Sequence, residues 1–500
     1  MAQSVDAYFE DHRETGDLGR QAVRGGIVSV TMQYGNGALQ IIAQVVLARL
    51  LTPTDFGLVA IITVLTSFAP LLIDFGLGDA TTQRSKITPS QISSLFWLAS
   101  AIGLAVAVVV AAASPLIAQI YREPRLEPIA LCTAITFVLW GVSNQHLALL
   151  RRTMQFGRIA TIQLLGTLAG IVIAIALAIF GFGYWALVAR PIARALCVAA
   201  GAWTGCRWRP GRPVLDNEVK SMGRFGLQVV SFSVTYTVAK SVDRIGLGLF
   251  YSPAQLGYYQ NAATLYQYSI WMALEQVHTV GSAALSKLQS QPAALRQRYE
   301  TALSTLAFVV MPLATILSVT AEDVTVLLLG EKWRPGALLL RIIALRGILE
   351  VVEASAGWLH LSIGRADRWR NWGIAYLITQ IVGVVAGLPF GTTGVAVACT
   401  VASGLVAIPA VLYAGRPIAV GPALILRAVG PQLIGAVSAA AVGAWLQASL
   451  LAHWPGLARI VVSTTVCGCI YLVIVVGVFR HTEPVRIARS VIQGRFGRKR

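Results

Sequence analysis

The sequence predicts an all-α, polytopic membrane protein with about 14 transmembrane helices. Of its 500 residues, 56% are hydrophobic and 12% are charged, and the mean hydropathy is positive. This composition is typical of a chain dissolved in lipid rather than in water. Apolar windows of about 20 residues, enough to cross a bilayer core about 30 Å thick, recur along the chain. Lys and Arg gather in every second connection between these windows, as in membrane proteins of alternating topology.

Each apolar window is assigned to one helix. The windows at 26–50, 225–250, 256–285 and 337–361 are the weakest by hydropathy, because they hold Gln, Asn, Tyr and charged residues. In chain order the expected helices lie at 26–50, 56–78, 92–119, 126–148, 159–181, 183–205, 225–250, 256–285, 298–322, 337–361, 370–392, 393–415, 423–447 and 456–479.

The distribution of positive charge predicts the orientation. Five Lys or Arg lie in the connection 206–224 and seven in the tail 480–500, whereas the short connections 51–55 and 251–255 have none. Since cytoplasmic loops retain positive charge, both termini are expected in the cytoplasm. The net charge of +18 then reflects membrane insertion and attraction to anionic headgroups, and no nucleic-acid partner is expected.

One short motif, a proline corner between two apolar windows, occurs twice in the sequence. LARLLTPTDFGLVA at 47–60 and LGLFYSPAQLGYYQ at 247–260 share a proline and a glycine at the same offset. Proline is tolerated at the first turn of a helix, and the preceding Thr52 or Ser252 is a natural N-cap. Because the corner recurs after six helices on the same predicted side, we expect two parallel repeats.

The repeats and the composition divide the chain into six segments. The first 25 residues are polar and lack the apolar core of a secretory signal. Residues 206–224 have the Pro, Gly and charge of a linker. We expect a cytoplasmic N-terminal segment, a six-helix N-lobe, a cytoplasmic linker, a six-helix C-lobe, two extra helices and a basic cytoplasmic tail on anionic headgroups, at 1–25, 26–205, 206–224, 225–415, 416–479 and 480–500.

Several motifs along 24–415 together resemble the Wzx-type polysaccharide flippases of the multidrug, oligosaccharidyl-lipid and polysaccharide flippase superfamily. The motifs are LARLLTPTDFGLVA at 47–60, LLIDFGLGDATTQR at 71–84, SQISSLFWL at 90–98, SVDRIGLGLFYSPAQLGYYQNAATLY at 241–266 and LLGEKWRPG at 328–336.

This resemblance implies two lobes around a central cavity, lined largely by the helices at 26–50, 56–78, 225–250 and 256–285. It also implies a multi-pass protein of the bacterial inner membrane that moves an undecaprenyl-diphosphate-linked oligosaccharide to the periplasmic leaflet. The expected partners are this lipid-linked glycan, membrane lipids and polysaccharide polymerase or export machinery.

Two embedded cations are the main candidates for contact with substrate. Lys240 and Arg244 are four residues apart, hence on one face of an unbroken helix, and each would cost about 2.5–3.5 kcal/mol at the centre of a membrane helix. Asp243 offers a partner, but two cations against one carboxylate leave one positive charge over. The 200-residue offset places Gln40 and Gln44 at the equivalent positions of the N-lobe.

Further candidates lie on the expected helices at 26–50 and 256–285. Arg49, in the LARLLTP motif, either contacts substrate or stabilises its own turn. Tyr266, Gln267 and Trp271 suit a sugar ring, since aromatic faces and amides match its C–H patches and hydroxyls; the alternative is an interfacial aromatic belt.

Acidic residues in the predicted spans have two interpretations. Asp74 and Glu275 could couple transport to an ion or serve as simple charge partners. The spacing of Arg346, Glu350 and Glu353 favours an internal ladder of ion pairs on one helix face.

Catalytic chemistry is not expected. The six Cys and six His form no metal-binding spacing, and no nucleotide-binding loop occurs. We expect no enzyme activity, no metal and no cofactor. The alternatives are a cation-coupled multidrug exporter of the same superfamily and, less favoured, a polytopic glycan polymerase or glycosyltransferase.

Overall fold

The computed structural model describes residues 18–74, 77–83, 87–214, 234–235, 237–271, 285, 288–289, 291–363, 366–480 and 486. These residues form α-helices joined by short 3-10 and π-helical turns, and none of them is in a β-strand. The predicted all-α fold class is therefore confirmed. Glu275, most of the segment 206–224 and nearly all of the basic tail lie outside the described residues.

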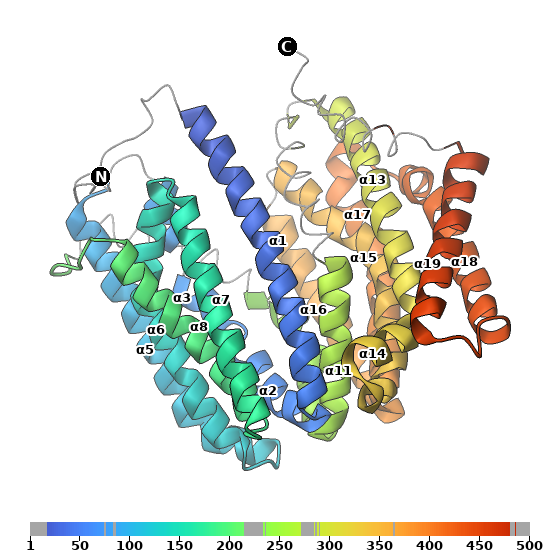
Figure 1. Ribbon diagram of the computed structural model, residues 1–500. Coiled ribbons are helices and arrows are strands. Elements are labelled where there is room, and N and C mark those ends of the chain that lie inside the picture. Colours follow the sequence, from blue (N-terminus) through green and yellow to red (C-terminus); the bar gives the residue numbers. More distant parts are fainter. Residues whose placement is uncertain are drawn as a thin grey trace. The chain divides into compact units, whose positions relative to one another are not determined.

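The chain forms two compact units, 1–257 and 258–500. In the first unit α5 packs along α6, α7 packs along α8, and α1 lies against α7 (Figure 1). Its helices are α1 Leu18–Leu50, α2 Pro53–Leu65, α3 Ala69–Asp74, α4 Leu77–Gln83, α5 Pro89–Ile120, α6 Leu126–Arg152, α7 Phe156–Ile179, α8 Trp185–Gly205, α10 Val242–Phe250 and the first turn of α11 Pro253–Tyr266.

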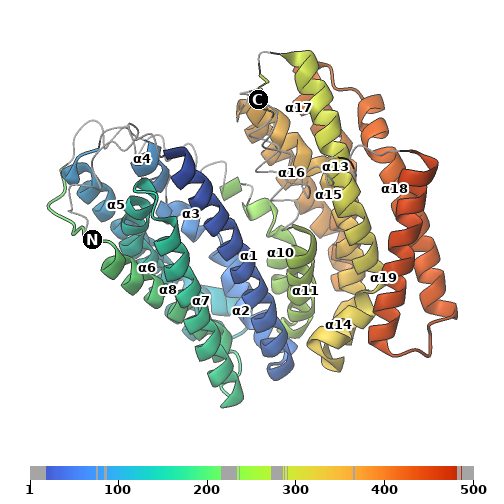
Figure 2. The ribbon, with the colours of Figure 1, turned by 45° about the horizontal axis from the view of Figure 1, so that its top comes forward.

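In the second unit α15 packs against α13 and α17, and α17 also packs along α16 (Figure 2). The last two helices pair with each other and pack on α13, where Gln432 Nε2 donates to Ser304 Oγ at 2.9 Å. The elements are η3 Gln267–Trp271, α13 Pro292–Val319, α14 Ala321–Leu329, η4 Glu331–Gly336, α15 Ala337–Ser362, α16 Ala366–Gly387, η5 Leu388–Phe390, α17 Gly391–Gly415, η6 Arg416–Ile418, α18 Pro422–Ser449, α19 Gly456–Leu472 and η7 Val473–Val478.

Nine helical segments within the described ranges are long and apolar enough to cross a membrane. One of them, Arg368–Ile418, covers both predicted helices at 370–392 and 393–415. α1 and α15 match the predicted windows 26–50 and 337–361 in length but are too polar to be counted among the nine. Their polarity agrees with the weak hydropathy of these two windows, and the chain is a multi-pass membrane protein.

The long helices carry apolar side chains on their outer faces. On α5, Leu104, Val108 and Val109 are more than half exposed, a pattern expected where lipid replaces water. On its inner face α5 meets α6 at backbone distance, because a Cβ at Gly103 would lie 2.6 Å from the Phe137 carbonyl oxygen. Close approach at small residues is how membrane helices gain van der Waals contact where the hydrophobic effect is absent.

Two local details differ from the expected helices. The predicted helix 56–78 is interrupted at 66–68, where Thr66 Oγ1 donates to the Ile62 carbonyl at 2.7 Å and Ser67 Oγ donates to the Val64 carbonyl at 2.8 Å. Such local side-chain bonds compete with helix continuation. Residues 323–336, expected as an outside loop, contain most of α14 and all of η4.

The described part of the predicted linker, 206–214, packs onto the first unit. Trp208 is 3% exposed, Gly211 N–H donates to Ser93 Oγ at 3.0 Å, and Ser94 Oγ donates to the Val214 carbonyl at 2.7 Å. This stretch is therefore a structured extension of α8 across the start of α5. The division into two six-helix lobes with a linker at 206–224 stays a prediction.

Candidate functional site

Both proline corners are closed by the same reciprocal cap. At the start of α2, Asp55 N–H donates to Thr52 Oγ1 at 3.3 Å and Thr52 N–H donates to Asp55 Oδ2 at 2.8 Å. At the start of α11, Gln255 N–H donates to Ser252 Oγ at 3.4 Å and Ser252 N–H donates to Gln255 Oε1 at 3.2 Å. Each pair is a capping box that satisfies N–H groups left without partners at a helix start. The predicted caps are confirmed at both corners.

The two corners also pack against each other through their glycines. A Cβ at Gly57 would lie 1.7 Å from the Pro253 carbonyl oxygen, and a Cβ at Gly257 would lie 1.9 Å from the Pro53 carbonyl oxygen. Contacts this close are possible only for residues without a Cβ. All four residues belong to the first unit. The repeated corner therefore forms a reciprocal contact in which each copy supplies the glycine and the carbonyl that the other needs.

The embedded cations lie at the start of α10, the helix that leads to the second corner. Lys240 is in a turn, Ser241 is the N-cap, and the helix begins only at Val242. The expectation that Lys240 and Arg244 share one face of a continuous helix is therefore wrong. Helical spacing no longer relates these two side chains, although Gln40 and Gln44 do lie within the unbroken helix α1.

Hydrogen bonds to the turn hold the Arg244 side chain. Its Nη2 donates to the Lys240 carbonyl at 2.6 Å, and its Nε lies 3.6 Å from Asp243 Oδ1. The Arg244 side chain is 22% exposed and that of Asp243 is 14% exposed. Arg244 and Asp243 are thus partly buried, and the Arg244 side chain is held against the turn that contains Lys240. A role of these residues in substrate contact stays a prediction.

On α1, the predicted amides are partly or fully inside the protein. Gln44 is 8% exposed and Gln40 is half-buried. Arg49 is exposed in the last turn of α1, where the negative end of the helix dipole stabilises a cation.

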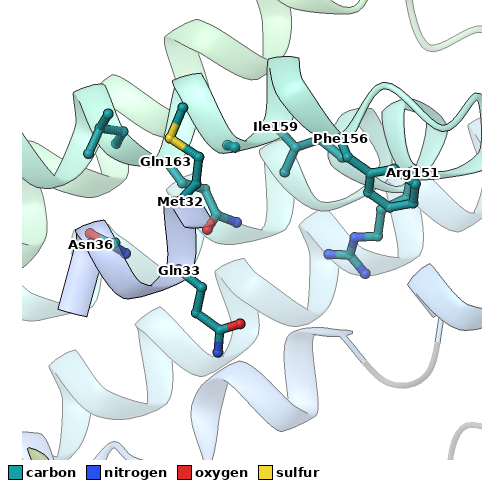
Figure 3. Close-up of a pocket in the computed structure, with 9 residues that line it drawn as sticks. Met32, Gln33, Asn36, Arg151, Phe156, Ile159 and Gln163 are labelled. Atoms are coloured by element: carbon teal, nitrogen blue, oxygen red, sulfur yellow. The ribbon is translucent and has the colours of Figure 1, made fainter. Parts of the chain in front are cut away.

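A polar pocket opens in the first unit between α1, the end of α6 and the start of α7 (Figure 3). Figure 3 shows the Gln163 amide and the Arg151 guanidinium extending to the same side of α7, with the Gln33 amide on that side too. The pocket has a volume of about 370 Å³ and is lined by Met32, Gln33, Asn36, Arg151, Phe156, Ile159, Ala160, Gln163 and Leu164.

Sequence reasoning missed this pocket. Gln33 and Asn36 continue toward the N-terminus the row of amides that includes Gln40 and Gln44, at helical spacings of three and four residues. That row is a usable signal, whereas Arg151 is one of several cations near the end of α6 and its sequence context does not single it out. Asp74 lies close by, since Asp74 Oδ1 and Arg151 Nη1 would lie 2.9 and 3.7 Å from a Cβ at Gly78.

The predicted sugar-binding residues fall in the second unit and have different environments. Tyr266 is 8% exposed, and its hydroxyl donates to Glu350 Oε2. Gln267 is exposed in the π-helical turn η3, and the side chain of Trp271 lies outside the described residues. Contact of these residues with sugar stays a prediction.

Glu350, which accepts the hydrogen bond from Tyr266, also belongs to a buried ion pair on α15. Arg346 Nε lies 3.0 Å from Glu350 Oε1, and Arg346 Nη2 donates to the Tyr376 hydroxyl at 3.0 Å. The ion pair predicted for Arg346 and Glu350 is thus confirmed. Within the described ranges, no group of three or more His, Cys, Asp or Glu side chains could hold a metal ion.

More than half of the chain matches one protein-family model. Residues 46–338 match the model described as polysaccharide biosynthesis protein. The chain is 25% identical over 381 residues to the teichuronic acid biosynthesis protein TuaB of Bacillus subtilis (strain 168), covering 73% of this chain and 78% of TuaB. It is 26% identical over 358 residues to the lipopolysaccharide biosynthesis protein WzxC of Escherichia coli (strain K12), covering 70% of this chain and 71% of WzxC.

Solved structures show the same fold. The lipid II flippase MurJ in an inward closed conformation aligns with a TM-score of 0.69 at 15% identity, over 91% of this chain and 99% of MurJ. An inward-facing multidrug resistance transporter of the MATE family aligns with a TM-score of 0.55 at 13% identity, over 80% of this chain and 98% of that chain. At these low sequence identities the structural similarity is evidence for the fold alone.

Proposed function

The chain belongs to the polysaccharide biosynthesis protein family, and from this premise we propose that it is a flippase for polyprenyl-diphosphate-linked oligosaccharide repeat units. It moves them from the cytoplasmic to the periplasmic leaflet of the bacterial inner membrane, for exopolysaccharide, capsule or lipopolysaccharide assembly. The relatives support this function by name, since WzxC is a lipopolysaccharide biosynthesis protein and the fold is that of a lipid II flippase. The chain then acts as a transporter and not as an enzyme, with both termini in the cytoplasm.

The observation that carries this proposal is the positive charge at the start of α10. Lys240, Asp243 and Arg244 lie together at the start of α10, where the side chains of Arg244 and Asp243 are 22% and 14% exposed. A cation in a membrane span costs about 2.5–3.5 kcal/mol on insertion scales unless water, a counter-ion or a ligand compensates it. A diphosphate suits this group, because its oxygens accept charge-assisted hydrogen bonds from both Lys and Arg.

The polyprenyl tail stays in lipid while the diphosphate and the glycan cross by alternating access. Outward movement of two negative charges from a negative cytoplasm gains about 4.6 kcal/mol per 100 mV, at about 2.3 kcal/mol per charge. Gln40 and Gln44 offer hydrogen bonds to the same headgroup, and Arg49 offers a further cation. The delivered glycan is consumed by a polysaccharide polymerase or export machinery.

Charge-selective variants test the proposal in cells that depend on this chain for surface polysaccharide. Arg244→Lys keeps the charge but loses the fork that reaches the Lys240 carbonyl, whereas Arg244→Gln and Lys240→Gln remove the charge. We expect outer-leaflet delivery of the lipid-linked glycan to fall most in the Lys240→Gln/Arg244→Gln double variant. Arg427→Gln, a substitution of an exposed cation on α18, is the matched control.

Two results would contradict the proposal at different levels. Full delivery by the double variant at normal membrane levels would remove the role of the cations. Delivery that continues when the chain is absent, with no lipid-linked intermediate accumulating on the inner leaflet, would remove the flippase function itself.

A further inference from the structure

The pocket between α1, α6 and α7 has the chemistry of a second ligand site. Its volume of about 370 Å³ falls in the range of about 300–1,000 Å³ typical of small-molecule sites. Its lining combines one cation, three amides and apolar side chains. On the predicted topology it opens toward the cytoplasm, because Arg151 and Arg152 end α6 and Arg158 lies in the first turn of α7.

Arg151 gives the pocket its preference for an anion. Among the described residues that line the pocket it alone is charged, and its side chain is exposed. The Asp74 carboxylate lies near it at Gly78, but across the part of the chain that the structure describes no carboxylate oxygen lies within 4.0 Å of its guanidinium. The neighbouring Arg152 differs, since its Nη1 donates to the Thr81 carbonyl at 3.0 Å. A planar guanidinium with available donors is the group proteins use for bidentate contact with phosphate.

The amides add a preference for hydroxyl groups. Asn36 Oδ1 is buried and, as far as the described residues go, accepts no hydrogen bond. A buried acceptor left without a donor is costly, and a ligand hydroxyl would satisfy it. Gln33 and Gln163 can both donate and accept. Phe156, Ile159 and Leu164 supply apolar surface for the C–H faces of a sugar ring.

We propose that this pocket is an entry subsite that binds a phosphate-linked sugar on the cytoplasmic side, before the headgroup reaches Lys240 and Arg244. Arg151 binds phosphate oxygens, and the three amides bind the hydroxyls of the first sugar. The row of amides on α1, from Gln33 and Asn36 to Gln40 and Gln44, then offers successive hydrogen bonds along one helix face. This subsite rests on the proposed flippase function, since it presumes that a lipid-linked glycan is the cargo.

The test measures binding by the full-length protein in phosphatidylcholine nanodiscs. Three ligands distinguish binding of the lipid-linked diphosphate, of the lipid-linked sugar and of a sugar phosphate without lipid. They are undecaprenyl diphosphate, undecaprenyl-diphosphate-N-acetylglucosamine and soluble N-acetylglucosamine 1-phosphate. Arg151→Gln should weaken both lipid-linked ligands about 10-fold, the loss expected for one charge-assisted contact. Gln163→Leu should weaken only the glycosylated lipid. Arg207→Gln, which removes an exposed cation outside the pocket, should change neither by more than about twofold.

The outcomes separate this inference from the proposed function. Unchanged binding in both Arg151→Gln and Gln163→Leu, with binding lost in Lys240→Gln, would overturn the subsite and leave the flippase proposal standing. Binding of the soluble sugar phosphate as tight as that of the glycosylated lipid would overturn the assignment to a lipid-linked ligand. Failure of the wild-type protein to bind any of the three ligands would also overturn the subsite, whereas the flippase function is decided by delivery in cells.

Discussion

Replacing Gly57 or Gly257 by alanine should force the two proline corners apart. The new Cβ at position 57 would lie 1.7 Å from the Pro253 carbonyl oxygen, whereas ordinary contact begins at 3.4 Å. The carbonyl must therefore move by about 1.7 Å for this contact to become ordinary. Because the obstacle is backbone, no rotamer change can relieve the clash, and the corner has to shift as a whole.

The magnitude follows from two opposing effects. Overpacking costs about 1–3 kcal/mol, and a backbone obstacle favours the upper end of that range. Alanine returns about 0.5–1 kcal/mol through its better helix propensity. Each single variant should therefore lose about 2 kcal/mol, or about 4–8 °C in Tm for a unit of this size. Since one separation of the corners relieves both clashes, the Gly57→Ala/Gly257→Ala double variant should lose less than the sum of the singles.

Thermal unfolding of the full-length protein in detergent, followed by tryptophan fluorescence at one scan rate, measures these shifts. Gly468→Ala is the matched control, because nothing lies within 4 Å of a Cβ at that helical position. Unchanged Tm in both single variants, or strictly additive losses in the double variant, would refute the reciprocal contact.

Three further changes test other parts of the structure. Tyr266→Phe removes the hydroxyl that donates to Glu350, and it should destabilise the protein by about 1–3 kcal/mol as measured by thermal unfolding, because a buried carboxylate loses a donor. Thr52→Ala removes the cap of α2 and should cost about 1 kcal/mol in the same measurement, whereas Thr52→Ser should cost little. The pKa of Glu123, in the connection before α6, is lowered by its hydrogen bond from Arg125. This pair therefore stabilises the protein above the unfolded carboxyl pKa and stops doing so as the pH falls through the folded pKa, and Glu123→Gln should reduce the acid-dependent loss of Tm.

Sequence patterns located the helices well because lipid imposes a length and a polarity on each span. The window 337–361 became α15 Ala337–Ser362, and the window 126–148 became α6 Leu126–Arg152. The corner caps at Thr52 and Ser252 were also predictable, since an N-cap followed by proline is a local signal.

The candidate site was less predictable, because it depends on local breaks and on distant neighbours. Helical periodicity assumes an unbroken helix, but the chain turns at Lys240 and the Arg244 side chain bonds back to that turn. The contact of Gly57 with Pro253 joins residues about 200 positions apart. Neither corner motif by itself predicts that the two corners are in contact. The pocket that contains Arg151 likewise draws on three helices, so its lining appears only after they pack.

The most direct test of the flippase account is transport by the purified protein in liposomes. Undecaprenyl-diphosphate-N-acetylglucosamine is placed in the leaflet that faces the cytoplasmic side of the protein, and its arrival in the other leaflet is followed with an impermeant sugar-oxidising reagent. The account predicts protein-dependent arrival that speeds up when the receiving side is positive and that is strongly reduced in the Lys240→Gln/Arg244→Gln variant. Equal arrival in protein-free liposomes, or full rates in that variant at every potential, would contradict it.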